Sequence, residues 1–211
     1  MASERHDPEF LQNAAKPVGE DGRALISRMN GGHHEELSTW GLSLVHPNGA
    51  DRIIDLGCGG GANLVRLADA APEAHVTGLD YSQVSIDVSR ETCANLIQAG
   101  RCDLVLGDVG HLPFEDASFD FASAFETVYF WPDVQRAFAE ANRVLAPGGR
   151  FMICNEADGT HEGDYQNVGV IKGMRVYKPE EIVGMLEQAG FSRVEVFRRE
   201  ERSWIVFEAF A

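Results

Sequence analysis

Residues 53–64 constrain the fold more than any other stretch of the chain. An apolar run ends in Asp55, and glycine occupies four of the five positions from 57 to 61. Apolar residues then recur at helical spacing, at Leu64, Leu67, Ala68 and Ala71. This order predicts a strand, a tight turn and a helix. Glycine tolerates positive φ and has no side chain, so the turn can approach a ligand closely, and the helix offers free N–H groups at its start.

Asp55 distinguishes between two kinds of ligand for this turn. A dinucleotide-binding turn usually keeps the end of its strand apolar and places the pyrophosphate at the helix N-terminus. A carboxylate two residues before the first glycine repels a pyrophosphate and favours a cationic ligand, or one with N–H and O–H donors. The stretch resembles motif I of the class I S-adenosylmethionine-dependent methyltransferases, Asp/Glu-x-Gly-x-Gly-x-Gly, which is matched position by position by Asp55, Gly57, Gly59 and Gly61.

Composition disfavours several classes of partner. The 211 residues suit one domain with a real core, and the formal net charge of -15, from 33 acidic and 18 basic residues, argues against nucleic acid and anionic membranes. Residues 1–10 are polar and no apolar run approaches bilayer length, so we expect a cytoplasmic protein. The four cysteines lack metal-type spacing, which predicts reduced thiols and no metal site. The oligomeric state stays open.

Strands and helices alternate after residue 51. After the strand that leads into the glycine turn, further strands are predicted at 75–80, 104–106, 119–125 and 150–155. Ser82 is a plausible N-cap for a helix that runs to Gln98, and residues 146–149 end another helix. The last strands, 192–197 and 203–210, have a short link and must be antiparallel neighbours.

This order predicts an α/β fold, with a doubly wound, seven-stranded and mostly parallel sheet whose last strand is antiparallel. It is the Rossmann-like methyltransferase fold that motif I suggests. Residues 1–50 are predicted to form an N-terminal helical cap segment. Residues 51–211 are predicted to form the methyltransferase core, a single domain.

More motifs in the expected order extend the resemblance over residues 52–210. Residues 78–82 resemble the second motif of the family, and residues 107–108 the third. Residues 112–120 resemble the segment that leads into strand four, residues 131–133 match a common Leu-Pro-Asp, and residues 145–151 resemble Leu-x-Pro-Gly-Gly-x-Phe/Leu. The chain is similar to the small-molecule methyltransferases of the domain 11/25 type, which implies S-adenosylmethionine as the cofactor.

The resemblance also implies a cofactor site. It implies that Asp80 accepts hydrogen bonds from a ribose diol and that Asp108 accepts one from an adenine amino group, while Val109 packs on the ring. It places Asp55 within reach of the methionine ammonium, directly or through water. The other residues that it implies at the cofactor are Gly57, Cys58, Gly59, Gly61, Tyr81 and Phe125. A simpler interpretation is that Asp80 and Asp108 only cap the segments that follow them.

Four residues are candidates for catalysis: His33, His34, Glu126 and Tyr129. The histidines lie in a glycine-flanked break, where either can hold the cofactor carboxylate, orient an acceptor or act as a base. Alternatively His34 caps a helix that begins near Glu35 while His33 is solvated. Glu126 is expected at the sulfonium and the acceptor, or as a solvated loop carboxylate. Tyr129 is expected in the acceptor pocket with Phe130 and Trp131, or packed under the next helix.

The resemblance implies methyl transfer to a small-molecule acceptor. Residues 156–178 stand where the family places a variable lid, and their small number favours a small acceptor, neutral or cationic given the acidic side chains. Two alternatives stay open: a non-catalytic regulatory protein that binds S-adenosylmethionine or S-adenosylhomocysteine, and a nicotinamide oxidoreductase, which Asp55 disfavours. Methylation of arsenite would need cysteines clustered at the acceptor, where Cys154 is plausibly placed.

Overall fold

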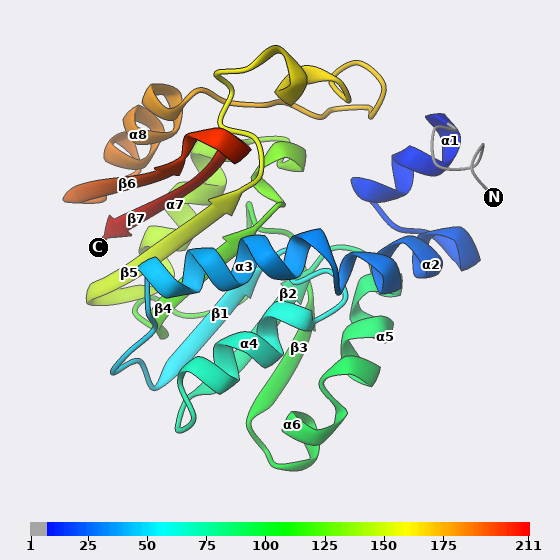
Figure 1. Ribbon diagram of the computed structural model, residues 1–211. Helices are drawn as coiled ribbons and strands as arrows, with labels where there is room; N and C mark the ends of the chain where they lie inside the picture. The colour runs from blue at the N-terminus through cyan, green and yellow to red at the C-terminus, as the bar shows by residue number, and fades with distance from the viewer. Residues whose placement is uncertain (1–7) are drawn as a thin grey trace.

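The computed structural model describes residues 8–211, apart from the side chains of Pro8, Glu9 and His33. Residues 1–7 lie outside the described residues, and with them most of the polar stretch 1–10 and the start of the predicted cap segment. A single seven-stranded sheet has the order β3-β2-β1-β4-β5-β7-β6 (Figure 1). Its strands are β1 (Arg52–Leu56), β2 (His75–Asp80), β3 (Cys102–Leu106), β4 (Phe119–Phe125), β5 (Leu145–Asn155), β6 (Arg193–Arg199) and β7 (Trp204–Phe210).

The first five strands are parallel, and β7 runs antiparallel between β5 and β6. The predicted doubly wound sheet with its antiparallel last strand is therefore confirmed. The order changes direction at β1, which lies between β2 and β4. In open α/β sheets, ligands bind beyond the carboxyl ends of the strands at such a point.

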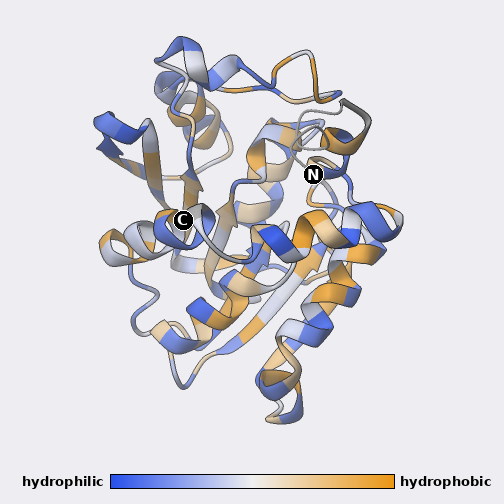
Figure 2. Ribbon diagram, turned by 45° about the vertical axis from the view of Figure 1, so that its right-hand side comes forward, coloured by the Kyte–Doolittle hydropathy of each residue, from blue (hydrophilic) through white to orange (hydrophobic). Residues whose placement is uncertain are grey.

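Helices cover both faces of the sheet (Figure 1). On one face pack α3 (His33–Leu44), α4 (Ala62–Ala70) and α5 (Gln83–Thr92), and on the other α7 (Val134–Val144) and α8 (Pro179–Gln188). Successive side chains of β4 point to opposite faces: Phe121 packs in the apolar cluster under α3, α4 and α5, and the next residue, Ala122, packs in the cluster under α7 and α8. In Figure 2 the helices carry both hydrophobic and hydrophilic residues, as expected when one side faces a sheet and the other faces solvent.

Several boundaries differ from the sequence prediction. The helix expected to reach Gln98 is divided at Cys93 into α5 and α6 (Ala94–Gln98), where the Cys93 thiol donates to the Gly61 carbonyl at 3.5 Å. β5 was predicted to begin at residue 150 but begins at Leu145, which pairs with Phe119. The residues between 145 and 150 stay in the sheet because Gly148 and Gly149 hydrogen-bond to Ala211 at the end of the chain.

The break expected at residues 30–34 is shorter than predicted. α2 (Gly19–Met29) ends before it, and α3 already begins at His33. The N-cap is Gly32, with a φ of 64°, and no side chain caps the helix. The interpretation of His34 as a cap is therefore wrong, since it lies inside the first turn of α3.

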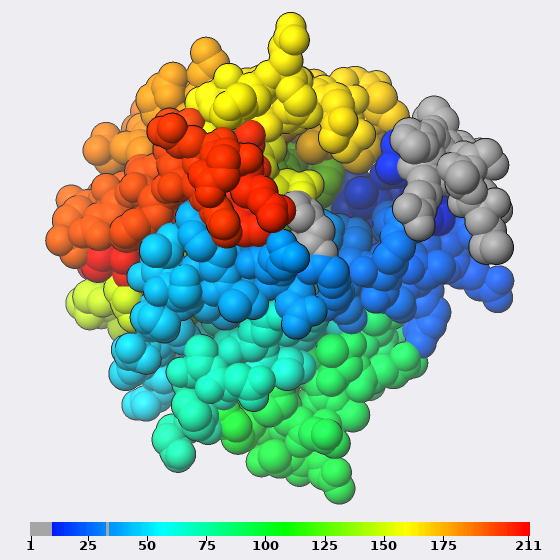
Figure 3. Space-filling model, in the orientation of Figure 1, coloured from blue at the N-terminus to red at the C-terminus, as the bar shows by residue number. Residues whose placement is uncertain are grey.

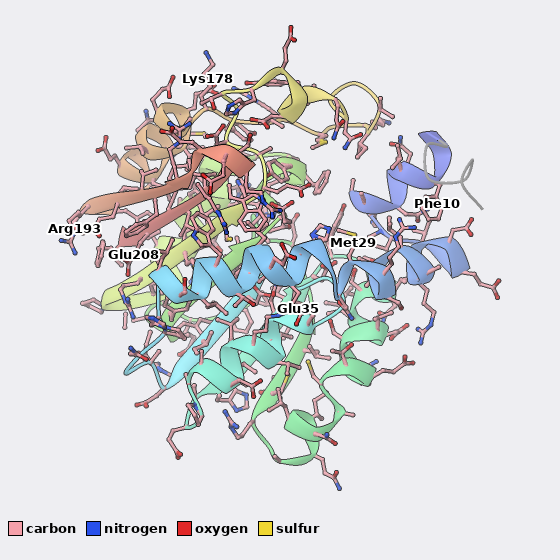
Figure 4. The ribbon with its side chains drawn as sticks, in the orientation of Figure 1. Phe10, Met29, Glu35, Lys178, Arg193 and Glu208 are labelled. Carbon is pink, nitrogen blue, oxygen red and sulfur yellow. The ribbon has the colours of Figure 1, made fainter. Side chains whose placement is uncertain are left out.

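The remaining elements are short. They are α1 (Pro8–Leu11) and the 3-10 turns η2 (Gln12–Ala14), η3 (Val128–Phe130), η4 (Glu162–Tyr165) and η5 (Glu200–Arg202). We call residues 156–178, between β5 and α8, the lid. It ends at Lys178, labelled in Figure 4. None of the described helices combines the length and the apolar character that a membrane crossing requires.

Candidate active site

A pocket lies at the carboxyl ends of β1 to β4, under α2 and the first turns of α3. Figure 3 shows the surface hollowed between the lid, α3 and the N-terminal helices. Of the residues predicted to bind the cofactor or to act in catalysis, ten line this pocket: His34, Gly57, Cys58, Gly59, Asp80, Tyr81, Asp108, Val109, Phe125 and Glu126. Asp55, Gly61 and Tyr129 do not line it, and the side chain of His33 lies outside the described residues.

The glycine turn forms the floor of the pocket. The backbone N–H groups of Gly57 and Cys58 donate to the Leu79 carbonyl at 2.8 and 3.0 Å, which ties the turn to β2. Gly59 has a φ of 54°, and a Cβ placed on it would meet only a methyl carbon of Ile26 at 4.0 Å. The space above Gly59 therefore belongs to the pocket, and any side chain there would occupy it.

Asp80 lines the pocket and also holds the turn. Its carboxylate accepts from the N–H of Gly59 at 3.0 Å and from that of Ser82 at 2.8 Å. Burial raises the pKa of Asp80, while these N–H donors oppose the rise. Asp80 therefore caps the segment that follows β2 and also borders the pocket, while its contact with a ribose stays a prediction.

Ser85 is a pocket residue that the sequence analysis missed. Its side chain is fully buried, and it lies close enough to Asp80 to lower the pKa of that carboxyl. Its hydroxyl nevertheless makes no hydrogen bond of ordinary geometry with the described residues. A buried hydroxyl without a partner is costly, so a ligand that brings a polar group here satisfies it. A ribose diol beside Asp80 fits this pair of side chains.

Asp108 and Val109 border the pocket beyond the end of β3. The Asp108 carboxylate accepts from the N–H of Gly110 at 2.8 Å, the local turn that an aspartate commonly forms. Its second oxygen and the apolar Val109 side chain together can meet a flat heterocycle that carries an amino group. The structure thus brings Asp80 and Asp108 to one pocket.

Asp55 is buried beneath the pocket. Its side chain is 1% exposed and accepts from the Ser123 hydroxyl at 2.7 Å. Burial raises the pKa of Asp55 to about 7, the Ser123 hydroxyl opposes the rise, and the negative charge of Asp80 adds to it. This placement does not support a direct contact between Asp55 and a ligand, whereas a contact through water stays a prediction.

Glu126 follows β4 and faces the pocket with a constrained geometry. Its φ of 57° is unusual for a residue other than glycine, and its carboxylate accepts from the Glu156 N–H at 2.5 Å and from the Tyr129 hydroxyl at 3.2 Å. Burial, followed by the charge of Glu156, raises the pKa of Glu126 well above its usual range. The interpretation of Glu126 as a solvated loop carboxylate is therefore wrong.

Tyr129 holds Glu126 in place from behind the pocket wall. Its side chain is buried, and its hydroxyl accepts from the Ala157 N–H at 2.9 Å. The expectation that Tyr129 lines the acceptor pocket is not met, because its ring turns away to pack with Ala157 and Val176. The neighbouring aromatic residues Phe130 and Trp131 do line the pocket.

Arg66 is a second pocket residue that the sequence analysis missed, because a charged residue in a helix is usually at the surface. Its guanidinium donates to the Asn30 carbonyl at 3.2 Å and to the Asn63 side chain at 3.0 Å. Among the described residues that line the pocket, it is the only Lys or Arg. The sole signal for it in the sequence is its position five residues after Gly61.

The N-terminal residues cover the pocket and bind to its rim. The Tyr81 hydroxyl donates to the Ala15 carbonyl at 2.5 Å, and the Ser82 hydroxyl donates to the Pro17 carbonyl at 2.7 Å. Met29, which lines the pocket, stands where α2 meets α3 (Figure 4). Gln12 reaches the lid, where its amide donates to the Val170 carbonyl at 2.7 Å and accepts from the Lys172 N–H at 2.9 Å.

The cysteines do not form an acceptor site. All four are free, as predicted, and only Cys58 lines the pocket. Cys154 is buried under α3, with its thiol 3.7 Å from the Leu37 carbonyl. Its predicted place at the acceptor is therefore wrong, and the described residues lack the cysteine cluster that arsenite would need.

Comparisons with known proteins agree with this geometry. This strand order, with a glycine turn after β1 and aspartates at the carboxyl ends of β2 and β3, is that of a Rossmann-like methyltransferase. Residues 54–153 match the family model described as a methyltransferase domain. The chain is 31% identical over 193 residues to a ubiquinone/menaquinone biosynthesis C-methyltransferase of Methylobacterium nodulans, of which it covers 76%. The chain belongs to the class I S-adenosylmethionine-dependent methyltransferase family.

The chain is also similar to a second sequence relative and to a solved structure. The chain is 34% identical over 172 residues to a malonyl-[acyl-carrier protein] O-methyltransferase of Geobacter sulfurreducens, and the match covers 76% of this chain and 63% of that relative. An O-methyltransferase family protein of Burkholderia thailandensis has the same fold, with a TM-score of 0.79 and 16% identity, over 99% of this chain and 61% of its own. The chain thus spans less than two thirds of both proteins.

Proposed function

We propose that the protein is an enzyme that transfers a methyl group from S-adenosylmethionine to a small-molecule acceptor. The observation that carries the proposal is the open floor at Gly59, bordered by Asp80 and by the buried, unsatisfied hydroxyl of Ser85. These groups fit a ribose diol. The names of the relatives, which include an O- and a C-methyltransferase, support the reaction class.

The roles of the residues follow from their positions. Asp80 and Ser85 hold the ribose, and Asp108 with Val109 holds the adenine. S-adenosylmethionine, when bound, supplies a methyl group on a positively charged sulfur, already activated for transfer. The protein then has to place the acceptor and exclude water. His34 and Glu126 reach the pocket from α3 and from the end of β4, where they can orient an acceptor or take its proton.

The aromatic side of the pocket is the place for the acceptor. Phe130 and Trp131 line it next to Glu126. Met174 of the lid packs against the same apolar cluster as Phe130, and Gln12 ties the lid to the N-terminal residues. We propose that residues 8–32 act as a cap on the cofactor, whereas α3 packs on the sheet as part of the core. A cytoplasmic location and the lack of a nucleic-acid partner stay predictions from the sequence.

The second candidate is a regulatory protein that binds the cofactor without turnover. Glu126 argues against it, because a left-handed backbone and a carboxyl whose pKa is raised by burial stand at the acceptor side, where simple binding needs neither. The two candidates differ in product formation. Both predict binding of the cofactor, and neither predicts binding of a nicotinamide dinucleotide.

Isothermal titration calorimetry with S-adenosylmethionine, S-adenosylhomocysteine and NADH tests the proposal. We expect the first two to bind and NADH not to bind. The Asp80→Asn variant should bind S-adenosylhomocysteine at least about tenfold more weakly, since hydrogen bonds to a charged group contribute about 1.5–3 kcal/mol. Asp69→Asn, which neutralises an exposed aspartate of α4, is the matched control. Failure of the unaltered protein to bind either sulfur compound would refute the proposed function.

A further inference from the structure

Arg66 is a positively charged pocket residue without an acidic partner. Most of the described arginines form an ion pair with Asp or Glu. Arg66 lies half-buried on the second turn of α4 and bonds only to two neutral oxygens of the described residues. In a chain with 33 acidic and 18 basic residues, a cation that lines a pocket and has no carboxylate beside it indicates an anion that comes with a ligand.

Two neighbours hold the guanidinium in place without using all of its donors. Nη1 donates to the side-chain oxygen of Asn63 at 3.0 Å, and Nη2 donates to the Asn30 carbonyl at 3.2 Å. Asn30 is fixed in turn, because its amide donates to the Gly60 carbonyl at 3.0 Å. The guanidinium of an arginine carries further N–H groups, so it can still bind a ligand. It is thus held beside the glycine turn, and its planar fork suits a carboxylate.

The order of the strands places the parts of the cofactor along the pocket. Asp108 follows β3 and Asp80 ends β2, and these are the residues proposed for the adenine and the ribose. The next strand in the sheet is β1. The amino-acid end of S-adenosylmethionine would then lie over the glycine turn that follows β1 and leads into α4. Arg66 lines the pocket from α4, together with Asn30 and Asn63.

Charge also favours this part of the pocket for a carboxylate. The Asp and Glu residues that line the pocket, Asp80, Asp108 and Glu126, lie at the ends of other strands. An ionised carboxylate repels a second one, whereas it attracts the ammonium and the sulfonium of the cofactor. Ala62 and Asn63 begin α4 and line the pocket, so the positive end of this helix adds to the preference for an anion near Arg66.

We propose that Arg66 binds the carboxylate of the amino-acid end of S-adenosylmethionine and makes the pocket specific for ligands that carry this group. The inference rests on the proposed function and deepens it, because Asp80, Ser85 and Asp108 leave the amino-acid end without a partner. Asn63 is a positioning residue, since its side chain holds Nη1 of Arg66.

His34 is the other candidate for this carboxylate. It lies in the first turn of α3 and lines the same pocket. Arginine stays charged at every pH at which the protein is studied, and it can bind both oxygens of a carboxylate at once, so Arg66 is the better partner. The two assignments predict that different variants lose the preference for a carboxylate.

Calorimetry with two ligands tests the assignment. One is S-adenosylhomocysteine, and the other is its decarboxylated analogue, which keeps the adenosine, the sulfur and the ammonium. We expect the unaltered protein to bind S-adenosylhomocysteine at least about tenfold more tightly, which corresponds to about 1.4 kcal/mol. Arg66→Met should remove this preference by weakening the binding of S-adenosylhomocysteine alone. Arg90→Met, which removes an exposed arginine of α5, is the matched control and should keep the preference.

Asn63→Asp tests the same contact with Arg66 still present. The substitution keeps the size of the side chain and places a carboxylate against the guanidinium, where it competes with the carboxylate of the ligand. An acidic residue in the first turn of a helix is stabilising, so the variant should fold. It should bind S-adenosylhomocysteine about tenfold more weakly and should not weaken the binding of the analogue. An unchanged affinity for S-adenosylhomocysteine would overturn the assignment.

The outcomes separate this inference from the proposed function. If the unaltered protein binds neither S-adenosylmethionine nor S-adenosylhomocysteine, the proposed function fails together with the assignment. If it binds S-adenosylhomocysteine and the analogue equally well, only the assignment is overturned. Equal weakening of both ligands in Arg66→Met would also overturn it, because Arg66 would then act only on the cap through Asn30. A preference that is lost in His34→Gln and kept in Arg66→Met would overturn it in favour of α3.

Discussion

Replacing Asp55 by Asn should stabilise the ligand-free protein above neutral pH. The Asp55 side chain is 1% exposed, and burial raises its pKa from 3.8 to about 7. In the unfolded chain the same carboxyl is solvated and titrates near its usual value. Between these two pKa values the folded protein therefore holds a proton that the unfolded chain has lost.

The size of the effect follows from this difference. Because the folded pKa is the higher one, the stability contributed by the proton is complete below pH 3.8, falls as the pH rises and is lost above about pH 7. A gap of about three pKa units corresponds to at most about 4 kcal/mol. Asn has no proton to lose and keeps an oxygen for the hydroxyl of Ser123. The advantage of Asp55→Asn should thus grow from near zero at acidic pH to several kcal/mol.

Urea denaturation of both proteins between pH 4.5 and 8 measures this advantage directly. The exposed Asp69→Asn corrects for the general loss of one negative charge. An advantage that stays constant across this range, or a variant that is less stable than the parent at pH 8, would refute the argument from burial. The same variant should bind S-adenosylmethionine more weakly if Asp55 acts on the ligand through water, which calorimetry decides.

Three further predictions concern the frame around the pocket. Gly57→Ala, at a φ of 81° and with its Cβ 2.2 Å from a threonine hydroxyl oxygen after β4, should lower the free energy of unfolding by about 2 kcal/mol or more in urea. Arg198→Met removes the guanidinium that pairs with the fully buried Asp158 side chain, which keeps only the hydrogen bonds from Thr160 and the more distant His161 at 3.7 Å, and should cost about 3 kcal/mol; Asp158→Asn in that background should restore part of it. Gln12→Ala removes both hydrogen bonds to the lid, so amide exchange at Lys172 should accelerate about tenfold if they contribute about 1.4 kcal/mol, while a rate equal to that of the parent would show that they do not restrain the lid.

The sheet could be predicted because its signals are local and agree with one another. Strands covered on both faces appear as short apolar runs, and β1, β2 and β4 are such runs with turn residues around them. The short link between β6 and β7 leaves only an antiparallel pairing. The carboxyl ends of β1 to β4 follow from that order, which explains why Asp80 and Asp108 were placed correctly at one pocket.

The direction of individual side chains could not be predicted in the same way. Tyr129 and Phe130 are adjacent, yet only the second lines the pocket, because the 3-10 turn η3 rotates them apart. Glu156 meets Glu126 only since β5 lies beside β4, a contact across 30 residues. Spacing along a chain carries no information on such a contact until the register of the sheet is known.

The glycines of the turn were expected to let the backbone approach a ligand, but most of them are needed for a different reason. A Cβ on Gly57 would collide with Thr127, one on Gly60 would lie 2.3 Å from the Asn30 side chain, and one on Gly61 would lie 3.0 Å from Ser89. These three glycines are required by the packing of the protein on itself, and only Gly59 keeps space open for a ligand. Substitutions in the turn should therefore separate into two kinds. Gly59→Ala strains the backbone at a φ of 54°, at a cost of about 1 kcal/mol, but should weaken cofactor binding more than folding, whereas Gly60→Ala should loosen α2 and reduce stability first. If both variants lost affinity equally with no change in stability, the turn would instead serve the ligand throughout.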